Sequence, residues 1–64
     1  MPANTKLRDA RLSAKLTQLQ LAEECGLTEI KISRFETGRQ RPLAGEMDLI
    51  SGVLKRPVKK LVME

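Results

Sequence analysis

The sequence predicts a single all-α domain, and three observations support that prediction. Apolar residues recur at the spacing of amphipathic helices along most of the chain. Residues typical of helix starts and ends, mainly threonine, proline and glycine, separate these periodic segments. No repeat, low-complexity tract or linker interrupts them, and a chain of 64 residues can form one thin hydrophobic core but no second domain.

The first helix is expected over about residues 5–14. Leu7, Ala10, Arg11 and Ala14 would share one face at helical spacing, and that face would pack on the core. Lys15 would then close the helix at a position better suited to glycine.

The second helix is expected over about residues 18–25. Thr17 precedes an apolar-periodic run, so its hydroxyl is a good N-cap for the free N–H groups of the first turn. Within the run, Leu21, Ala22 and Cys25 would face inward. Gly26 can adopt the left-handed conformation that ends a helix.

The third helix is expected over about residues 28–37. Thr28 is again a capping threonine, Ile32 and Phe35 form an inward face, and Gly38 ends the helix before a loop over residues 39–42. Two short capped helices joined through a glycine, the second with a polar and basic face, have the layout of a helix-turn-helix. Duplex DNA is therefore the first candidate ligand.

A fourth helix is expected over about residues 43–54, with Met47, Ile50, Val53 and Leu54 facing inward. It is the weakest of the helix predictions because its two interior glycines each cost about 1 kcal/mol relative to alanine. A short turn or fifth helix over about residues 58–63 would follow Pro57.

Composition excludes most other classes of function. Twelve Lys and Arg against eight Asp and Glu give a net charge of +4, which favours polyanionic partners or is ordinary solubilising charge. With one cysteine and no histidine, the chain cannot form a disulfide framework, a Cys/His zinc cluster or a serine triad, and it has no glycine-rich phosphate loop. We therefore expect no enzyme activity, no cofactor and no metal.

Neither a signal peptide nor a membrane span is found, so a cytoplasmic, nucleoid-associated protein is expected.

The chain closely resembles the phage repressor and Cro type of helix-turn-helix, also called the Xre-like or lambda-repressor-like family. The resemblance covers nearly everything from Leu7 to Met63, and its most specific parts are residues 7–11, 16–18, 21–28 and 32–39, followed by Pro42. It implies a compact five-helix domain in which helices two and three form the helix-turn-helix. The third helix would lie in the major groove of DNA.

The chemistry of the third helix agrees with that implication. If Ile32, Phe35 and Glu36 face inward, a polar side is left outward, and a merely solvated face is the alternative. Arg34 can donate two hydrogen bonds to guanine, Glu29 can accept one from cytosine, and Ile30 can pack on a thymine methyl. The predicted base-contacting residues are Glu29, Ile30, Lys31, Ser33 and Arg34.

Further roles follow from the resemblance alone. Gln18 matches a family glutamine that bridges a phosphate and the recognition helix, and the loop after the third helix matches one that lies along the backbone, although a mobile basic loop would have the same sequence. The predicted phosphate-contacting residues are Gln18, Thr28, Thr37, Arg39, Gln40 and Arg41. Arg11 and Glu36 occupy the positions of a partly buried structural ion pair. Cys25 stands where the family has a leucine-like core residue, so a buried, inert thiol is expected.

Three residues depart from the family pattern. Lys55 replaces the usual glycine that closes the fourth helix. Leu12 and Leu19 stand where polar residues are usual, and they are either ordinary exposed leucines or part of a partner surface.

The function predicted is a sequence-specific, non-catalytic DNA-binding regulator, a repressor or autoregulator, and no small-molecule effector site is evident. One module makes too few base contacts for tight binding, so a homodimer on a pseudo-palindromic operator is expected. The candidate dimer contacts are Leu54, Val58, Leu61, Val62 and Met63. The alternative is an antitoxin or adaptor that uses the fold mainly to bind protein.

Overall fold

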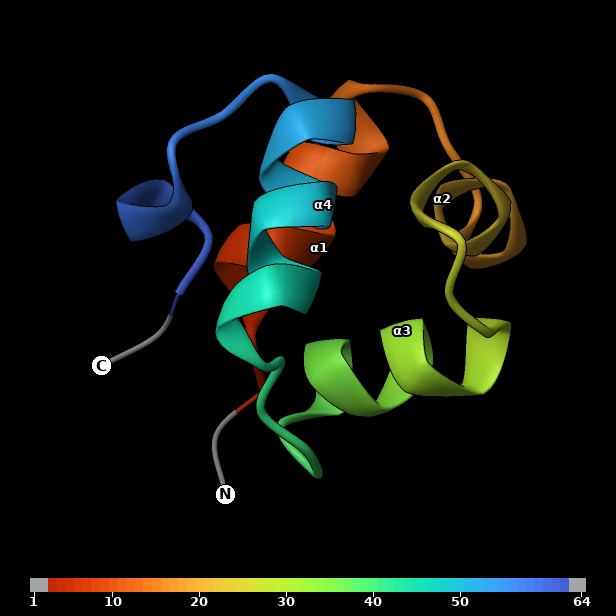
Figure 1. Cartoon of the computed structure of the whole chain (residues 1–64), viewed down its shortest axis with the longest axis vertical. Coiled ribbons are helices and arrows are strands. Elements are labelled where there is room, and N and C mark those ends of the chain that lie inside the picture. Colours follow the sequence, from red (N-terminus) through yellow and green to blue (C-terminus); the bar gives the residue numbers. More distant parts are fainter. Residues whose placement is uncertain (1–2, 63–64) are drawn as a thin grey trace.

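The computed structural model describes residues 3–62, and this part of the chain contains four α-helices and no strand (Figure 1). The helices are α1 (Thr5–Ser13), α2 (Gln18–Cys25), α3 (Glu29–Thr37) and α4 (Ala44–Leu54). A single 3-10 turn, η1 (Val58–Lys60), follows α4. None of these helices is long and apolar enough to cross a membrane. The all-α prediction is confirmed.

The predicted fifth helix is wrong for the described residues. Where a helix over residues 58–63 was expected, the chain forms one 3-10 turn of three residues, and residue 63 lies outside the described part. The segment starts after Pro57, and it carries two adjacent lysines between its apolar residues. It is too short to stabilise an α-helix by itself because the first turn fixes several residues for one hydrogen bond.

Short-range hydrogen bonds explain where three of the helices begin. The Thr17 hydroxyl accepts from the Gln20 N–H at 3.0 Å, and the Gln20 side chain accepts from the Thr17 N–H at 2.8 Å, which completes a capping box on α2. The Thr28 hydroxyl accepts from the Lys31 N–H at 3.2 Å and caps α3. The Asn4 side chain does the same for α1 through the Leu7 N–H at 3.0 Å. The start of each of these three helices is thus determined by hydrogen bonds between residues less than four apart.

The helices end in left-handed residues. Gly26 and Gly38 follow α2 and α3 at φ values of 71° and 78°. The left-handed conformation was predicted for Gly26, and the end of the third helix was predicted at Gly38. Lys55 stands in the equivalent place directly after α4 at a φ value of 55°, and Lys15 stands one residue further on, after Ala14 at the end of α1, at a φ value of 60°. Each of these residues reverses the chain so that the next N–H bonds back to a carbonyl of the last turn.

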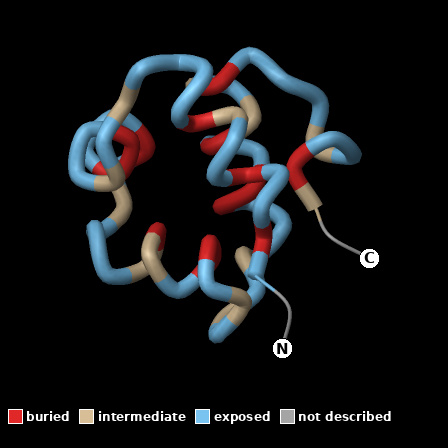
Figure 2. The backbone as a smooth tube through the Cα atoms, turned by 180° about the vertical axis from the view of Figure 1, so that it is seen from behind, coloured by how far each residue is buried: buried red, intermediate tan, exposed pale blue. Residues whose placement is uncertain are grey.

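The helices enclose one hydrophobic core, and the buried positions turn toward the centre of the molecule (Figure 2). Phe35 is its largest side chain, and each helix contributes to it: Leu7, Leu21, Ala22, Cys25, Ile32, Phe35, Met47, Ile50, Leu54 and Leu61. Ala14 was expected in this core and is exposed, because α1 ends at Ser13 and the chain turns away there.

Two of the predicted dimer contacts are wrong because their side chains lie in this core. Leu54 is 6% exposed and Leu61 is fully buried, so both pack inside the single chain. Val58 and Val62 are half-buried, and Met63 lies outside the described residues.

Asn4 joins the two ends of the chain to α3. Besides capping α1, its side-chain amide donates to the Leu61 carbonyl at 2.8 Å, and its backbone N–H donates to the Glu36 carbonyl at 2.8 Å. The residue is 7% exposed, and no described buried side-chain polar atom lacks a partner. These bonds fix the C-terminal end of α3 against the rest of the domain.

Candidate nucleic-acid interface

The outer face of α3 is open to solvent along the whole helix. Ile30 is 65% exposed, and Glu29, Arg34 and Thr37 are also exposed, whereas Ser33 is half-buried. An isoleucine so exposed at the start of a helix is available for contact with an apolar group on a ligand. Ile30, Ser33, Arg34 and Thr37 lie on one side of α3, opposite the buried Ile32 and Phe35, and Glu29 lies at the margin of that side.

The inner face of α3 is held by a buried ion pair. Arg11 Nε donates to Glu36 Oε2 at 2.6 Å, and Arg11 Nη2 donates to Glu36 Oε1 at 3.1 Å. The side chains are 9% and 4% exposed. Arg11 Nη1 also donates to the Leu16 carbonyl at 2.8 Å, so one guanidinium joins α1, the turn before α2, and α3. This pairing keeps the helix from rotating about its own axis.

Gln18 completes this network from the first residue of α2. Its side-chain amide donates to Glu36 Oε1 at 3.1 Å, which leaves one N–H of the same amide available to a phosphate. The residue is half-buried and stands at a helix N-terminus, where backbone N–H groups attract anions. The geometry can therefore serve a phosphate contact and a contact with α3 at the same time.

Thr28, which caps α3, and Thr37, its last residue, differ in what they can offer to a phosphate. Thr28 accepts a hydrogen bond in its capping role, so its hydroxyl hydrogen can still be donated outward. The Thr37 hydroxyl donates to the Ser33 carbonyl at 2.9 Å, so it must rotate before it can donate to a phosphate. Both residues are exposed.

Lys31 is engaged by an acid that sequence reasoning missed. Its ammonium lies 2.7 Å from Glu46 Oε2, while Glu46 Oε1 accepts from the Leu43 N–H at 2.9 Å. The hydrogen bonds from Lys31 and from this backbone N–H lower the pKa of Glu46. Glu46 is the third residue of α4 and follows Leu43, which is not a capping residue type, so no capping-box signal marked it in the sequence. Its pairing with α3 depends on tertiary structure.

In the loop after α3, the side chains rather than the backbone N–H groups are available to a ligand. The Arg39 and Gln40 N–H groups both bond to the Arg34 carbonyl, at 3.0 and 3.3 Å, so they are not directed at a ligand. Arg39 and Arg41 are exposed, and Gln40 is half-buried. A phosphate would be met by the side chains of this loop.

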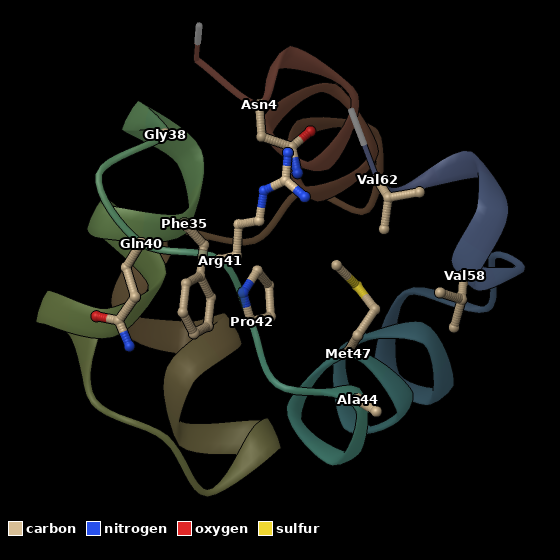
Figure 3. Close-up of a pocket in the computed structure, with 10 residues that line it drawn as sticks. All are labelled: Asn4, Phe35, Gly38, Gln40, Arg41, Pro42, Ala44, Met47, Val58 and Val62. Atoms are coloured by element: carbon tan, nitrogen blue, oxygen red, sulfur yellow. The ribbon is translucent and has the colours of Figure 1, made fainter. Parts of the chain in front are cut away.

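A pocket of about 290 Å³ lies beside the same loop. Figure 3 shows the residues that line the pocket. The Arg41 side chain extends toward Asn4, and the Gln40 side chain extends away from Asn4. The lining is mostly apolar: Asn4, Phe35, Gly38, Gln40, Arg41, Pro42, Ala44, Met47, Val58 and Val62. Of the predicted phosphate contacts in the loop, only Arg39 stands clear of this pocket.

The described residues hold no group of three His, Cys, Asp or Glu side chains that could bind a metal ion. Cys25 is 5% exposed, and burial, with a smaller contribution from Glu24, raises the pKa of its thiol. A buried thiol of raised pKa is a poor nucleophile. The exposed side chains of α3 and its following loop offer hydrogen-bond donors, a few acceptors and positive charge.

The family comparison agrees with the all-α fold. A family model described as "Helix-turn-helix" matches residues 7–61, which include α1 from Leu7 onward, all of α2, α3 and α4, and η1. No protein of curated function matches the chain closely. The family is one of DNA-binding transcription regulators. The chain thus belongs to the Cro/C1-type helix-turn-helix family, with α2 and α3 as its helix-turn-helix.

Proposed function

We propose that this protein is a sequence-specific regulator of transcription that represses a promoter, including its own, by occupying an operator in double-stranded DNA. The observation that carries the proposal is the contrast between the two sides of α3. Its inner side is locked by Arg11 and Glu36, and its outer side presents Arg34 to solvent. Such a helix can enter a groove without rearranging the domain. This activity would take place on the nucleoid in the cytoplasm.

Base recognition is assigned to the outer side of α3. An α-helix with its side chains is about 10–12 Å wide and fits the major groove, which is about 12 Å wide. Arg34 would donate two hydrogen bonds to a guanine, Glu29 would accept from a cytosine, and Ile30 would contact a thymine methyl. Ser33 is half-buried and would contribute at most one hydrogen bond.

Backbone recognition is assigned to residues on both sides of α3. Gln18 and Thr28 would contact one strand near the start of the helix, and Thr37, Arg39, Gln40 and Arg41 would contact the backbone past its end. Two of these residues, Arg39 and Arg41, are cations. Each phosphate that a cation neutralises contributes about −0.9 to the log-log slope of affinity against salt, so a slope of roughly −2 per domain, or roughly −4 for two domains, is expected. A protein without a role on DNA would show a much shallower slope.

Two copies of the domain would bind together. A palindromic operator with half-sites about one helical turn apart matches a two-fold dimer. Because Leu54 and Leu61 are buried, the contact is assigned to Val58 and Val62 at the pocket, which are the remaining described candidates. Val58→Glu should weaken cooperative binding to a palindrome and leave binding to one half-site unchanged.

Selection of bound duplexes from a random library tests the proposal most broadly. A recovered consensus with two-fold symmetry, bound with the salt slope given above, supports it. Recovery of random sequences, or binding that does not depend on salt, contradicts it.

An adaptor function is the second candidate, and one observation favours it. Leu12 on α1 and Leu19 on α2 are 50% and 48% exposed, which leaves two large apolar side chains on the surface. If they form a partner surface, changing both to glutamate should abolish capture of that partner without changing DNA affinity. Unchanged assembly and partner binding would remove this candidate.

A further inference from the structure

We infer that Glu46 holds the Lys31 ammonium against α4 and off the DNA, and that it thereby limits sequence-independent binding. Glu46 is a positioning residue in this scheme, because it acts on the interface through Lys31. The inference rests on the proposed function, since it assumes that α3 enters the groove.

Both oxygens of the Glu46 carboxylate are fixed. Oε1 accepts from the Leu43 N–H at the start of α4 at 2.9 Å, and Oε2 lies 2.7 Å from Lys31 Nζ. The Glu46 side chain is 11% exposed, whereas the Lys31 side chain is 42% exposed. The carboxylate is therefore an anchored group that holds a partly exposed lysine.

The anchor decides where one positive charge of α3 lies. Lys31 is three residues before Arg34, and residues three apart are neighbours on a helix surface. Released from Glu46, its flexible four-carbon stem could carry the ammonium to a phosphate at the edge of the groove. A lysine acts as a point charge without a directional fork, so such a contact would add affinity for every sequence equally. Paired with Glu46, the ammonium is neutralised and adds nothing to random DNA.

Glu46→Gln is the variant that separates these states. Glutamine has the same shape and keeps an oxygen that can accept from the Leu43 N–H, so the cap of α4 is retained. Its amide cannot hold the ammonium as a carboxylate does. Asp48→Asn is the matched control, because Asp48 is an exposed acid on the same helix and has no ion pair within residues 3–62. Both variants raise the net charge by one.

The measurement is affinity for the selected duplex and for a random duplex over a series of salt concentrations. For Glu46→Gln we expect the salt slope to steepen by about 1. We also expect affinity for random duplex to rise about three- to tenfold more than in Asp48→Asn. Affinity for the selected duplex should rise by the same factor, so the ratio of specific to random affinity should stay unchanged. Adding Lys31→Gln to Glu46→Gln should restore the slope of the wild type. Equal effects of Glu46→Gln and Asp48→Asn would overturn the inference.

Lys31→Gln alone gives a second test, which holds even if Glu46→Gln fails to fold. The inference predicts an unchanged salt slope for this variant. A slope shallower by about 1 would show that Lys31 already contacts a phosphate in the wild-type complex, which overturns the inference. Failure of the proposed function looks different, because the wild type itself would then show no preference for any duplex.

Discussion

Lys15 and Lys55 are held in a conformation that favours glycine. Both have positive φ values after a helix, where Gly26 and Gly38 serve α2 and α3. The left-handed region costs an L-residue about 1–2 kcal/mol because its Cβ approaches the carbonyl oxygen, and part of that cost is offset by the lower entropy of a non-glycine residue in the unfolded chain. Lys15 and Lys55 therefore make the folded domain less stable than it would be with glycine at these positions.

Lys15→Gly and Lys55→Gly should each stabilise the domain by about 0.5–1 kcal/mol, measured by urea unfolding. Gly26→Ala is the matched reverse change. A Cβ at Gly26 would meet no heavy atom within 4 Å, so backbone strain alone should destabilise that variant by about 1 kcal/mol. If Lys15→Gly and Lys55→Gly both lower the free energy of unfolding, the lysine side chains contribute more stability than their backbone conformation costs.

Glu46 makes the stability of the domain depend on pH in acid. Its pKa is lowered from the usual 4.5, so it adds stability above pH 4.5 and loses that contribution as the pH falls through its folded value. The difference in unfolding free energy between the wild type and Glu46→Gln should therefore shrink as the pH is lowered below 4.5. Thermal melts from pH 7 to pH 3 check this, and a difference that does not change with pH would contradict the assignment.

At the scale of elements, the Arg11–Glu36 pair joins α1 to α3 and receives Gln18 from α2. Because the pair is buried, loss of one partner leaves a charge that water cannot reach, and this costs about 3–5 kcal/mol. Arg11→Met and Glu36→Gln should each destabilise the domain by about that amount, whereas Gln18→Ala should cost about 1 kcal/mol or less. The double variant Arg11→Met with Glu36→Leu should recover much of the loss in urea unfolding. A double variant as unstable as the sum of the single changes would refute a charge-burial mechanism.

Elements set by neighbouring residues could be predicted from the sequence, and those set by distant contacts could not. Thr17, Thr28, Gly26 and Gly38 act within four residues, and the structure places them as expected. Asn4 is a capping residue type that could have been recognised, but its bond to the Leu61 carbonyl joins residues 57 apart. The short C-terminal segment lacks the length for a helix, and Leu61, which was predicted to be a dimer contact, fills the core of the single chain.

Within the candidate site the same division holds. Helical periodicity alone placed Ile30 and Arg34 on the exposed side of α3, and the structure has them there. It could not show that Lys31 meets Glu46, because that contact requires the packing of α4 on α3. Contact of any of these residues with DNA stays a prediction.

At the scale of the whole molecule, positive charge gathers in two places. Arg34, Arg39 and Arg41 lie on α3 and its following loop. A second group lines a cleft between α1 and the segment after α4, and no residue of α3 or its loop lines that cleft: Lys6, Arg56, Lys59 and Lys60, with Asp9. The net charge of +4 is therefore not concentrated on α3 and its following loop.

The two groups should differ in their effect on DNA binding. Changing Arg39 and Arg41 to glutamine should make the salt slope shallower by about 2, because two phosphate contacts are lost. Changing Lys59 and Lys60 to glutamine lowers the net charge equally and should leave the slope nearly unchanged. Equal changes in slope would mean that DNA also contacts the cleft.

The most direct measurement compares Arg34→Ala with Arg39→Ala on the selected duplex and on a scrambled duplex at one salt concentration. If α3 reads bases through Arg34, the first variant should lose discrimination between the duplexes by about 5- to 150-fold. The second should weaken binding to both duplexes by the same factor, because a phosphate contact carries no sequence information. Equal loss on both duplexes in both variants would contradict base reading by Arg34.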